Sequence, residues 1–409
     1  MAHVNAFKAL MPTPEAAAKV SAVPYDVVNR VEAAALANNE PLSFLHVSRA
    51  EIDLPADMDP YSTVVYDKAV ANLTDLRKNA PLAFDDDERV YVYSQTMNGH
   101  TQTGIVAAVA VDDYDSNLIK KHEKTRKAKE DDRTRHTCEV KCHSGPVFLL
   151  YEARADIDAM VNEIQKDAPH FDVHAEDGTR HKVWRCPKAL LPNMLTAFAQ
   201  VPDLYVADGH HRAKSASRTR GTMRAANPNH TGDESYNRFL AVMFPGNQLQ
   251  ILPYNRVVDD LNGLDKNSFM TKVKDSFEVT HGVAAKPECV GDVRMYLDGE
   301  WFGLKVRNVP KTGKVADTLD VAILQDQLLR PLLGIDDPRT SERINFIGGI
   351  RGTSELENLV NAGKYAVAFS MYPVTVEQLI AISDASEIMP PKSTWFEPKL
   401  RDGLLIHCF

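Results

Sequence analysis

The chain has 409 residues, of which 44% are apolar, and a formal net charge of −9 at pH 7. This length and apolar content suit one large domain or two to three smaller ones. The acidic balance argues against a general affinity for nucleic acid or anionic membranes, and no apolar run approaches the roughly 20 residues needed to span a bilayer.

The cysteines and the first residues indicate the compartment. The five cysteines are odd in number and mostly far apart, so reduced thiols are the default interpretation. Residues 1–8 lack the long apolar segment of a secretion signal. We therefore expect a cytoplasmic protein that engages neither nucleic acid nor membranes, with a homodimer as the commonest assembly for such a protein.

Helices and strands alternate along the chain. Apolar spacing predicts helices over residues 15–19, 28–37, 61–79, 156–166, 269–276, 321–329 and 376–385. Short apolar or alternating runs predict strands over residues 41–47, 89–95, 101–111, 147–151, 204–207, 239–244 and 365–371. Asn98 and Gly99 are typical of a hairpin turn between the second and third of these strands. The interleaving favours an α/β or α+β fold.

The strand predicted over residues 204–207 ends at Asp208, Gly209, His210, His211 and Arg212. Where a strand turns through glycine into a helix, backbone N–H groups point outward and bind anions. Glycine allows a ligand to approach the backbone closely, and arginine can bond a phosphate through two N–H groups. The aspartate can hold a metal or take a proton. The alternative is a solvated surface turn.

Residues 120–135 form a second cluster, in which eight of sixteen residues are Lys or Arg and four are acidic. Such runs are most often solvated helices with ion pairs. The functional alternative is a cationic wall for phosphate oxygens, with Glu123 as a carboxylate base. His122 and Glu123 resemble the start of a zinc-protease helix, but Arg126 stands where that motif needs a second histidine.

A third pattern in the sequence is that of a candidate metal site. His136, Cys138, Cys142 and His143 have a spacing that permits metal ligation. The paired Cys-x-x-Cys signature of a structural zinc site is missing. Buried or surface polar residues are the alternative interpretation of these four side chains.

Residues 389–400 contain three prolines, so they form neither a helix nor a central strand. This stiff segment could hold Lys392, Ser393 and Lys399 against an anionic ligand. It could equally cover the core with Trp395 and Phe396. The two interpretations are compatible.

Four segments, in order, resemble a bacterial and archaeal family catalogued as domain of unknown function ten-fifteen. They are Pro-Tyr-Asp-Val at 24–27, His-Glu-Lys-Thr at 122–125 followed by Asp132-Arg133, Ala-Asp-Gly-His-His-Arg at 207–212, and Met-Pro-Pro-Lys-Ser-Thr at 389–394. The Asp-Gly-His-x-Arg segment is similar to that of the free-serine kinases, which share a fold with ParB and sulfiredoxin. Those kinases phosphorylate free L-serine with a nucleotide and magnesium.

The resemblance implies an α+β fold, or more broadly α/β, with mixed sheets and a ParB/sulfiredoxin-like core enlarged by insertions. Residues 1–409 would form one family-length unit, with a catalytic lobe at 1–260 and a C-terminal lobe at 261–409 closed by residues 389–400. An insertion at about 144–202 would account for the 85 residues between Glu123 and Asp208.

The resemblance also implies a kinase, that is, a nucleotide-dependent phosphotransferase acting on the hydroxyl of a small metabolite such as free L-serine, with ATP or ADP as donor and Mg²⁺ as cofactor. Asp208 would stand at the acid position and bind Mg²⁺, Glu123 would be the base, and His210 would face phosphate. The other phosphate- and nucleotide-binding candidates are Gly209, His211, Arg212, His122, Thr125, Arg126, Arg133, Lys392 and Ser393.

Two other functions stay open at this point. A ParB-like nucleotide-binding regulatory switch is one, without DNA binding because the net charge of −9 counts against a DNA clamp. A phosphoester hydrolase is the other.

Overall fold

The computed structural model describes residues 1–80 and 82–409, which divide into two compact units. Unit 1 consists of residues 1–249 and 398–409, and unit 2 of residues 250–397. The units differ from the lobes predicted at 1–260 and 261–409, because the division falls at Leu249 and Gln250 and the end of the chain returns to unit 1.

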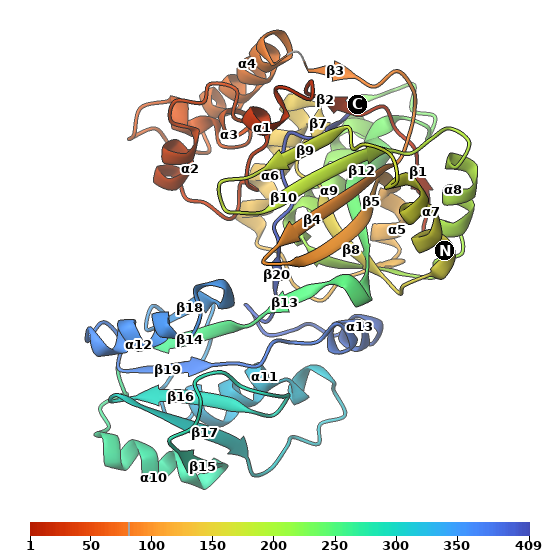
Figure 1. Ribbon diagram of the computed structural model, residues 1–409. Coiled ribbons are helices and arrows are strands. Elements are labelled where there is room, and N and C mark those ends of the chain that lie inside the picture. Colours follow the sequence, from red (N-terminus) through yellow and green to blue (C-terminus); the bar gives the residue numbers. More distant parts are fainter. Residues whose placement is uncertain (81) are drawn as a thin grey trace. The chain divides into compact units, whose positions relative to one another are not determined.

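Unit 1 is built on a nine-stranded sheet in the order β6-β11-β8-β12-β5-β4-β10-β9, with β1 paired to β5 (Figure 1). β8 pairs in parallel with β12, and β6 with β11, whereas the other pairs are antiparallel. The strands are β1 (Val4–Asn5), β4 (Tyr91–Met97), β5 (His100–Ala110), β6 (Ile119–Lys120), β8 (Val147–Tyr151), β9 (Phe171–His174), β10 (Arg180–Arg185), β11 (Leu204–Asp208) and β12 (Arg238–Pro245).

Helices cover this sheet because the central strands are apolar on both faces. β8 is buried along its whole length, and so is β5 apart from its ends and Thr101. The longest helix over β8 and β12 is α9, which also packs against α6 and α5. The helices of unit 1 are α1 (Ala17–Val20), α2 (Arg30–Ala37), α3 (Leu45–Ser48), α4 (Thr63–Asn79), α5 (Val111–Asp115), α6 (Lys127–Val140), α7 (Ala155–Ile164), α8 (Leu191–Phe198) and α9 (His210–Ala226).

Two small sheets complete unit 1. β2 (Leu10–Met11) pairs with β3 (Ala83–Phe84), and β7 (Cys142–His143) pairs with β21 (His407–Cys408), both antiparallel. β21 belongs to the segment that returns from unit 2, so the last residues of the chain are tied to a strand that follows α6.

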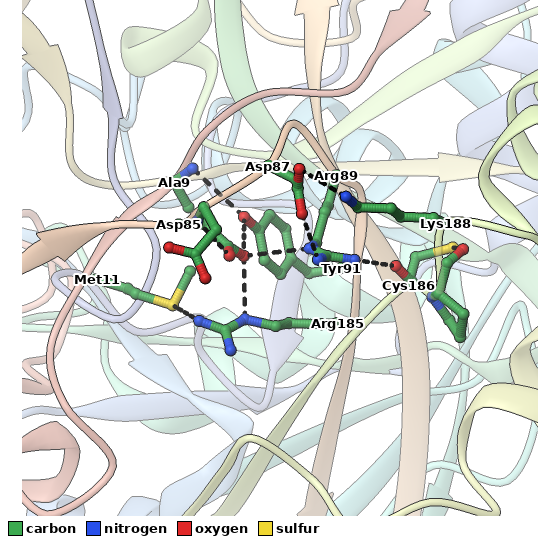
Figure 2. Close-up of polar contacts among 11 residues, drawn as sticks. Ala9, Met11, Asp85, Asp87, Arg89, Tyr91, Arg185, Cys186 and Lys188 are labelled. Atoms are coloured by element: carbon green, nitrogen blue, oxygen red, sulfur yellow. Dashed lines mark hydrogen bonds and ion pairs between the residues drawn. The ribbon is translucent and has the colours of Figure 1, made fainter.

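A buried carboxylate links β3, β4 and β10 (Figure 2). Asp85, with a side chain only 1% exposed, accepts hydrogen bonds from Tyr91 Oη at 3.0 Å and Arg185 Nε at 3.0 Å. Arg89 Nε lies 3.6 Å from the same oxygen, and the Ala9 N–H donates to the Tyr91 hydroxyl at 3.3 Å. Each charged group therefore has partners, as a buried charge requires.

Unit 2 contains an antiparallel six-stranded sheet in the order β15-β17-β16-β19-β14-β18, together with the two-stranded sheet β13-β20. Its strands are β13 (Gln250–Leu252), β14 (Tyr254–Val258), β15 (Phe277–His281), β16 (Val293–Leu297), β17 (Glu300–Val306), β18 (Ile344–Gly348), β19 (Val367–Ser370) and β20 (Trp395–Glu397). Its helices are α10 (Lys266–Ser276), α11 (Asp320–Leu324), α12 (Ser354–Asn361) and α13 (Val376–Asp384).

The mixed α+β class predicted from the sequence is confirmed. The hairpin at Asn98 and Gly99 is confirmed too, since both residues have positive φ, 52° and 80°. The strand predicted over residues 41–47 is wrong: α3 begins there, because Phe44, Leu45 and Val47 bury their side chains from a helix. The expected insertion at 144–202 supplies β8, β9 and β10, three strands of the large sheet.

Candidate functional site

A sharp bend joins β11 to α9. The pairing of β11 with β8 shifts register between Val206 and Asp208, and such a bulge re-aims the next side chain. Gly209 then adopts a φ of +90°, and a Cβ built on it would lie 3.0 Å from the Arg212 guanidinium carbon. Glycine is therefore favoured at 209 by the backbone conformation and by the packed arginine.

The first turn of α9 has no side-chain cap. Gly209 is the N-cap and has no side chain to accept from the first-turn N–H groups, whereas the first intrahelical bond runs from Ala213 N to Gly209 O at 2.9 Å. The N–H groups of an uncapped first turn, together with the helix dipole, attract negative charge. The helix has 17 residues, so this is the positive end of a long dipole.

Asp208 is held as an anion at this bend. Its Oδ2 lies 3.3 Å from Lys399 Nζ and 3.6 Å from Arg212 Nη2, and its Oδ1 accepts from the Gly209 N–H at 2.9 Å. Burial alone would raise the pKa of Asp208, but the two cations and the hydrogen bonds outweigh it and hold the pKa well below its ordinary value. Asp208 is thus ionised at neutral pH and is not a proton acceptor.

Arg212 joins the bend to the segment Pro-Tyr-Asp-Val at 24–27. Its side chain is 8% exposed, and Nη2 lies 3.8 Å from Asp26 Oδ2. Nη1 donates to the Pro146 carbonyl. Burial would lower the pKa of Arg212, yet Asp26, Asp208 and Asp402 raise it instead. The guanidinium therefore stays charged and pairs with two carboxylates, Asp26 and Asp208, at the bend.

His122 and His210 contact each other beneath the bend. Their Nε2 atoms are 3.3 Å apart, and their rings meet edge to face at 4.5 Å. Burial lowers the pKa of His122 to about 4 and, with His122 beside it, that of His210 well below its ordinary value. The lowered pKa values favour the neutral form of both imidazoles, in which one Nε2 donates to the other. This packing favours a positioning role for His210 over the expected one of facing phosphate.

The neighbouring segment reaches the bend through His211. The Arg126 N–H donates to His211 Nε2 at 3.1 Å, and Arg126 is the N-cap of α6. Thr125 donates to Glu130, which also pairs with Arg218 of α9. The two clusters found in the sequence, 122–126 and 208–212, are thus brought together, and α6 and α9 pack side by side. Glu123, which belongs to the first of these clusters, is exposed.

Arg133 lies at a cavity of about 40 Å³ on the other side of Arg212. Its Nε donates to Asp132 at 2.8 Å, and its guanidinium lies 4.2 Å from the centre of the Tyr25 ring. Asp402 also lines this cavity, and burial raises its pKa to about 7. Tyr25 and Asp402 come from opposite ends of the chain, and sequence reasoning did not select them.

The proline-rich segment divides between the two units. Lys392 and Ser393 belong to unit 2, where Lys392 Nζ lies 3.3 Å from the Tyr254 hydroxyl and Ser393 Oγ donates to the Pro390 carbonyl at 2.7 Å. Lys399 belongs to unit 1 and contacts Asp208. The signal for Lys399 was present in the sequence as the last lysine of the segment.

The proposed metal cluster at 136–143 does not form. His136 Nε2 bonds the Val47 carbonyl at 2.9 Å, and Cys142 and His143 lie in β7. Within residues 1–80 and 82–409, no group of three or more His, Cys, Asp or Glu side chains is arranged to hold a metal ion.

In that same part of the chain, no helix combines the length and apolar character needed to cross a bilayer.

The sequence profile of a family described as a protein of unknown function (DUF1015) matches residues 4–322. This range is well over half of the chain, so the chain belongs to that family, as the four motif segments predicted. The comparison with curated proteins gives no match. The cytoplasmic location and the homodimer stay predictions.

Solved structures are similar at low identity. A C-terminally truncated SbnI from Staphylococcus aureus matches with 12% identity and a TM-score of 0.39, covering 74% of this chain and 87% of its own. A free serine kinase in complex with AMP matches with 11% identity and a TM-score of 0.34, covering 74% and 91%. A conserved hypothetical protein from Pyrococcus furiosus gives 12% and 0.34, covering 74% and 94%. At these scores the ParB/sulfiredoxin-like character of the core stays a prediction.

Proposed function

We propose that this chain is a nucleotide-dependent phosphotransferase that transfers a phosphoryl group to the hydroxyl of a small metabolite. One observation carries the proposal: an ionised carboxylate, Asp208, sits between Lys399 and Arg212 at the glycine-initiated, uncapped N-terminus of α9. Phosphoryl transfer needs positioning and charge neutralisation more than covalent chemistry. At the bend, the first turn of α9 would position the phosphates, and Lys399 and Arg212 would neutralise their charge.

The nucleotide phosphates are assigned to the first turn of α9. The N–H groups of His210 and His211 follow Gly209 and have no side-chain cap, so a phosphate oxygen can accept from them. Lys399 contacts Asp208 from another segment of the chain, and its side chain is 21% exposed. It can exchange part of its contact with Asp208 for a phosphate oxygen. Arg126 is exposed at the start of α6 and adds positive charge nearby.

The base is assigned to Glu123. Asp208 cannot serve, because its lowered pKa makes it a poor proton acceptor. Glu123 is exposed and follows His122, whose imidazole is fixed against His210. The neutral histidine pair therefore positions the segment that carries the carboxylate. Glu123 would accept the proton of the acceptor hydroxyl as the phosphoryl group arrives.

The donor set at the bend fits a Mg²⁺ ion shared with substrate phosphates. Such an ion needs only one or two protein carboxylates, with phosphate oxygens and water completing the shell. Asp208 supplies one ionised carboxylate, and Asp26 lies on the other side of Arg212. When bound, the ion would neutralise charge on the phosphates.

A nucleotide-binding switch is the second candidate. The low pKa of Asp208 favours this candidate, because the bend then contains a fixed negative charge but no effective general base. In that case the chain binds nucleotide at the same first turn of α9 and transfers nothing.

A single assay separates the candidates. The purified chain is incubated with Mg²⁺, ATP or ADP labelled on the terminal phosphate, and a panel of hydroxyl metabolites that includes L-serine. We expect label in one phosphorylated metabolite and no such product from Glu123→Gln. Release of free phosphate with every acceptor supports a phosphoester hydrolase. Saturable binding without turnover supports the switch, and absence of nucleotide binding contradicts both.

The matched control for this assay is Arg224→Lys. Arg224 lies near the C-terminal end of α9, on the same helix as Arg212 but exposed. Arg212→Lys keeps the charge and loses the planar guanidinium that pairs with Asp26 and Asp208. We expect Arg212→Lys to lose most of the transfer activity and Arg224→Lys to keep it.

A further inference from the structure

Two cysteines face each other in the small sheet of β7 and β21. Cys142 is the register partner of Cys408, and the Phe409 N–H donates to the Lys141 carbonyl at 3.0 Å. Hydrogen-bonded and non-hydrogen-bonded pairs alternate along an antiparallel ladder, so Cys142 and Cys408 form a non-hydrogen-bonded pair. In that kind of pair the Cα atoms are about 4.5 Å apart, which lies within the range that a disulfide can bridge.

The adjacent histidines lie on the opposite face of the same two strands. His143 and His407 are the next register pair, and their rings stack with centroids 5.8 Å apart and planes 5° from parallel. Successive side chains in a strand point to opposite faces, so the imidazoles do not join the thiols. This separation explains why the described residues form no metal-binding group here. The cysteine pair is a dithiol rather than half of a zinc site.

The two thiols have different surroundings. Cys142 is buried, whereas Cys408 is partly exposed. The hydrogen bond from the Cys142 thiol, together with the nearby Arg77 guanidinium, lowers the pKa of Cys408. Contact with Cys408 and burial raise the pKa of Cys142 well above its ordinary value. A partly exposed thiol with a lowered pKa, next to a second thiol, is the arrangement found in oxidation-sensitive pairs.

We propose that Cys142 and Cys408 form a redox-sensitive disulfide site that hydroperoxides oxidise. The Cys408 thiolate attacks one oxygen of hydrogen peroxide and breaks the O–O bond, which leaves Cys408 sulfenic acid and hydroxide, the latter protonated to water. The Cys142 sulfur then attacks the Cys408 sulfur and breaks its S–O bond. The thiol proton leaves with the hydroxyl as water, so two thiols and one peroxide become one disulfide and two waters.

The disulfide would fasten the segment of residues 398–409. That segment is held in unit 1 by the bridges of Leu10 with Ile406 and of Ala22 with Asp402. It carries Lys399, which contacts Asp208, and Asp402, which lines the cavity beside Arg212. Oxidation is thus expected to hold these side chains in place, although the disulfide itself does not depend on the proposed function.

The bond is tested by peptide mapping. The reduced full-length chain is treated with hydrogen peroxide, the remaining thiols are alkylated, and the digest is analysed by mass spectrometry. We expect one cross-linked peptide pair containing Cys142 and Cys408 and the loss of two of the five thiols. Cys289→Ser, which removes an exposed cysteine, is the matched control and should give the same cross-link.

Cys408→Ser should abolish the cross-link while leaving Cys142 reduced. This variant is preferred to Cys142→Ser because Cys408 is partly exposed and its replacement spares the buried position. The proposal is overturned if Cys142 and Cys408 both stay thiols while other cysteines oxidise. It is equally overturned if Cys408 proceeds to sulfinic acid with Cys142 still free.

The fastening effect is tested by hydrogen exchange. We expect the amides of residues 399–407 to exchange about tenfold more slowly in the oxidised chain than in the reduced one, because the cross-link suppresses local opening. Peroxide-treated Cys408→Ser should exchange like the reduced chain. Equal exchange in the oxidised and reduced chains would show that the disulfide fastens nothing.

Discussion

Asp85 and Asp208 are two carboxylates of unit 1 that are each paired with two cations, and they differ in what else reaches them. The Asp85 side chain is 1% exposed, and Tyr91 and Arg185 both bond one oxygen at 3.0 Å (Figure 2). Its partners leave no room for a ligand. A closed cluster of this kind serves to connect strands.

Asp208 is 31% exposed, and its two cations are more distant, at 3.3 and 3.6 Å. It stands beside the uncapped first turn of α9, where backbone N–H groups need an acceptor. The charges alone do not distinguish a binding site from a structural cluster. Exposure of the carboxylate and backbone donors without an acceptor do.

The largest expected effect is that of Asp208→Asn on transfer. Removing one charge-positioning group typically costs about 10²- to 10³-fold in rate, and Asn keeps the shape of the side chain. Turnover of labelled nucleotide measures the effect, and the thermal midpoint should stay close to that of the parent chain. A variant with near-parental turnover would remove Asp208 from the site.

Asp85→Asn should show the opposite pattern. It removes the buried counter-charge of Arg89 and Arg185, at a cost of about 3 kcal/mol in the free energy of unfolding. Urea unfolding measures this loss, and nucleotide affinity of the folded variant should be unchanged. If Asp85→Asn weakened nucleotide binding as much as Asp208→Asn does, the distinction between the closed and open clusters would fail.

The buried histidine pair makes stability depend on pH. Burial lowers the pKa of His122 from 6.5 to about 4 in the folded chain. The unfolded chain therefore binds more protons between these values, so the stability is present above pH 6.5 and is lost as the pH falls toward 4. His122 should account for about 2 kcal/mol of the loss between pH 7 and pH 5. Urea midpoints at both pH values should show a smaller change for His122→Gln.

Lys399→Met distinguishes the two lysines of the proline-rich segment. Loss of a charge-assisted contact should weaken nucleotide binding about tenfold, or about 1.4 kcal/mol. Lys392→Met is the matched control, since the Lys392 amine lies beside the Tyr254 hydroxyl in unit 2. Calorimetric titration with ADP measures both. Equal losses of ADP affinity would mean that Lys392 also belongs to the nucleotide site.

The smallest effect concerns the bend itself. Gly209→Ala combines a positive φ with a close contact to Arg212, whereas Gly178, at a φ of +80°, has nothing within 4 Å of a built Cβ. Both substitutions strain the backbone. The contact should make Gly209→Ala about 1 kcal/mol more destabilising than Gly178→Ala. Urea unfolding of the two variants measures this difference. Equal losses of stability would mean that the Arg212 side chain moves aside at no cost.

Local patterns predicted some of the elements, whereas others, such as β9, β10 and β16, were not predicted. The strand at Val147–Tyr151 and the hairpin turn at Asn98 and Gly99 follow from apolar runs and turn chemistry, which act over a few residues. Residues 41–47 failed because a short apolar run does not distinguish a buried strand from a buried helix. The segment around Leu45 found its partners in α4, which only the tertiary fold supplies.

The site was predictable where its residues are adjacent in the chain. The motif at 208–212 was found as a unit because the strand, glycine and helix are local. Asp26 and Asp402 were missed as site residues, and Lys399 was selected only within the proline-rich segment, because only the fold brings the two ends of the chain to Arg212 and Asp208. Long-range placement of this kind leaves no periodic signal in a single sequence.

The measurement that tests the central claim most directly is a crystal structure of the chain with ADP and Mg²⁺. We predict phosphate oxygens within hydrogen-bond distance of the His210 and His211 N–H groups, with Lys399 Nζ in contact with the same phosphates. Ordered phosphates bound away from the first turn of α9, or no nucleotide at millimolar concentration, would contradict the account.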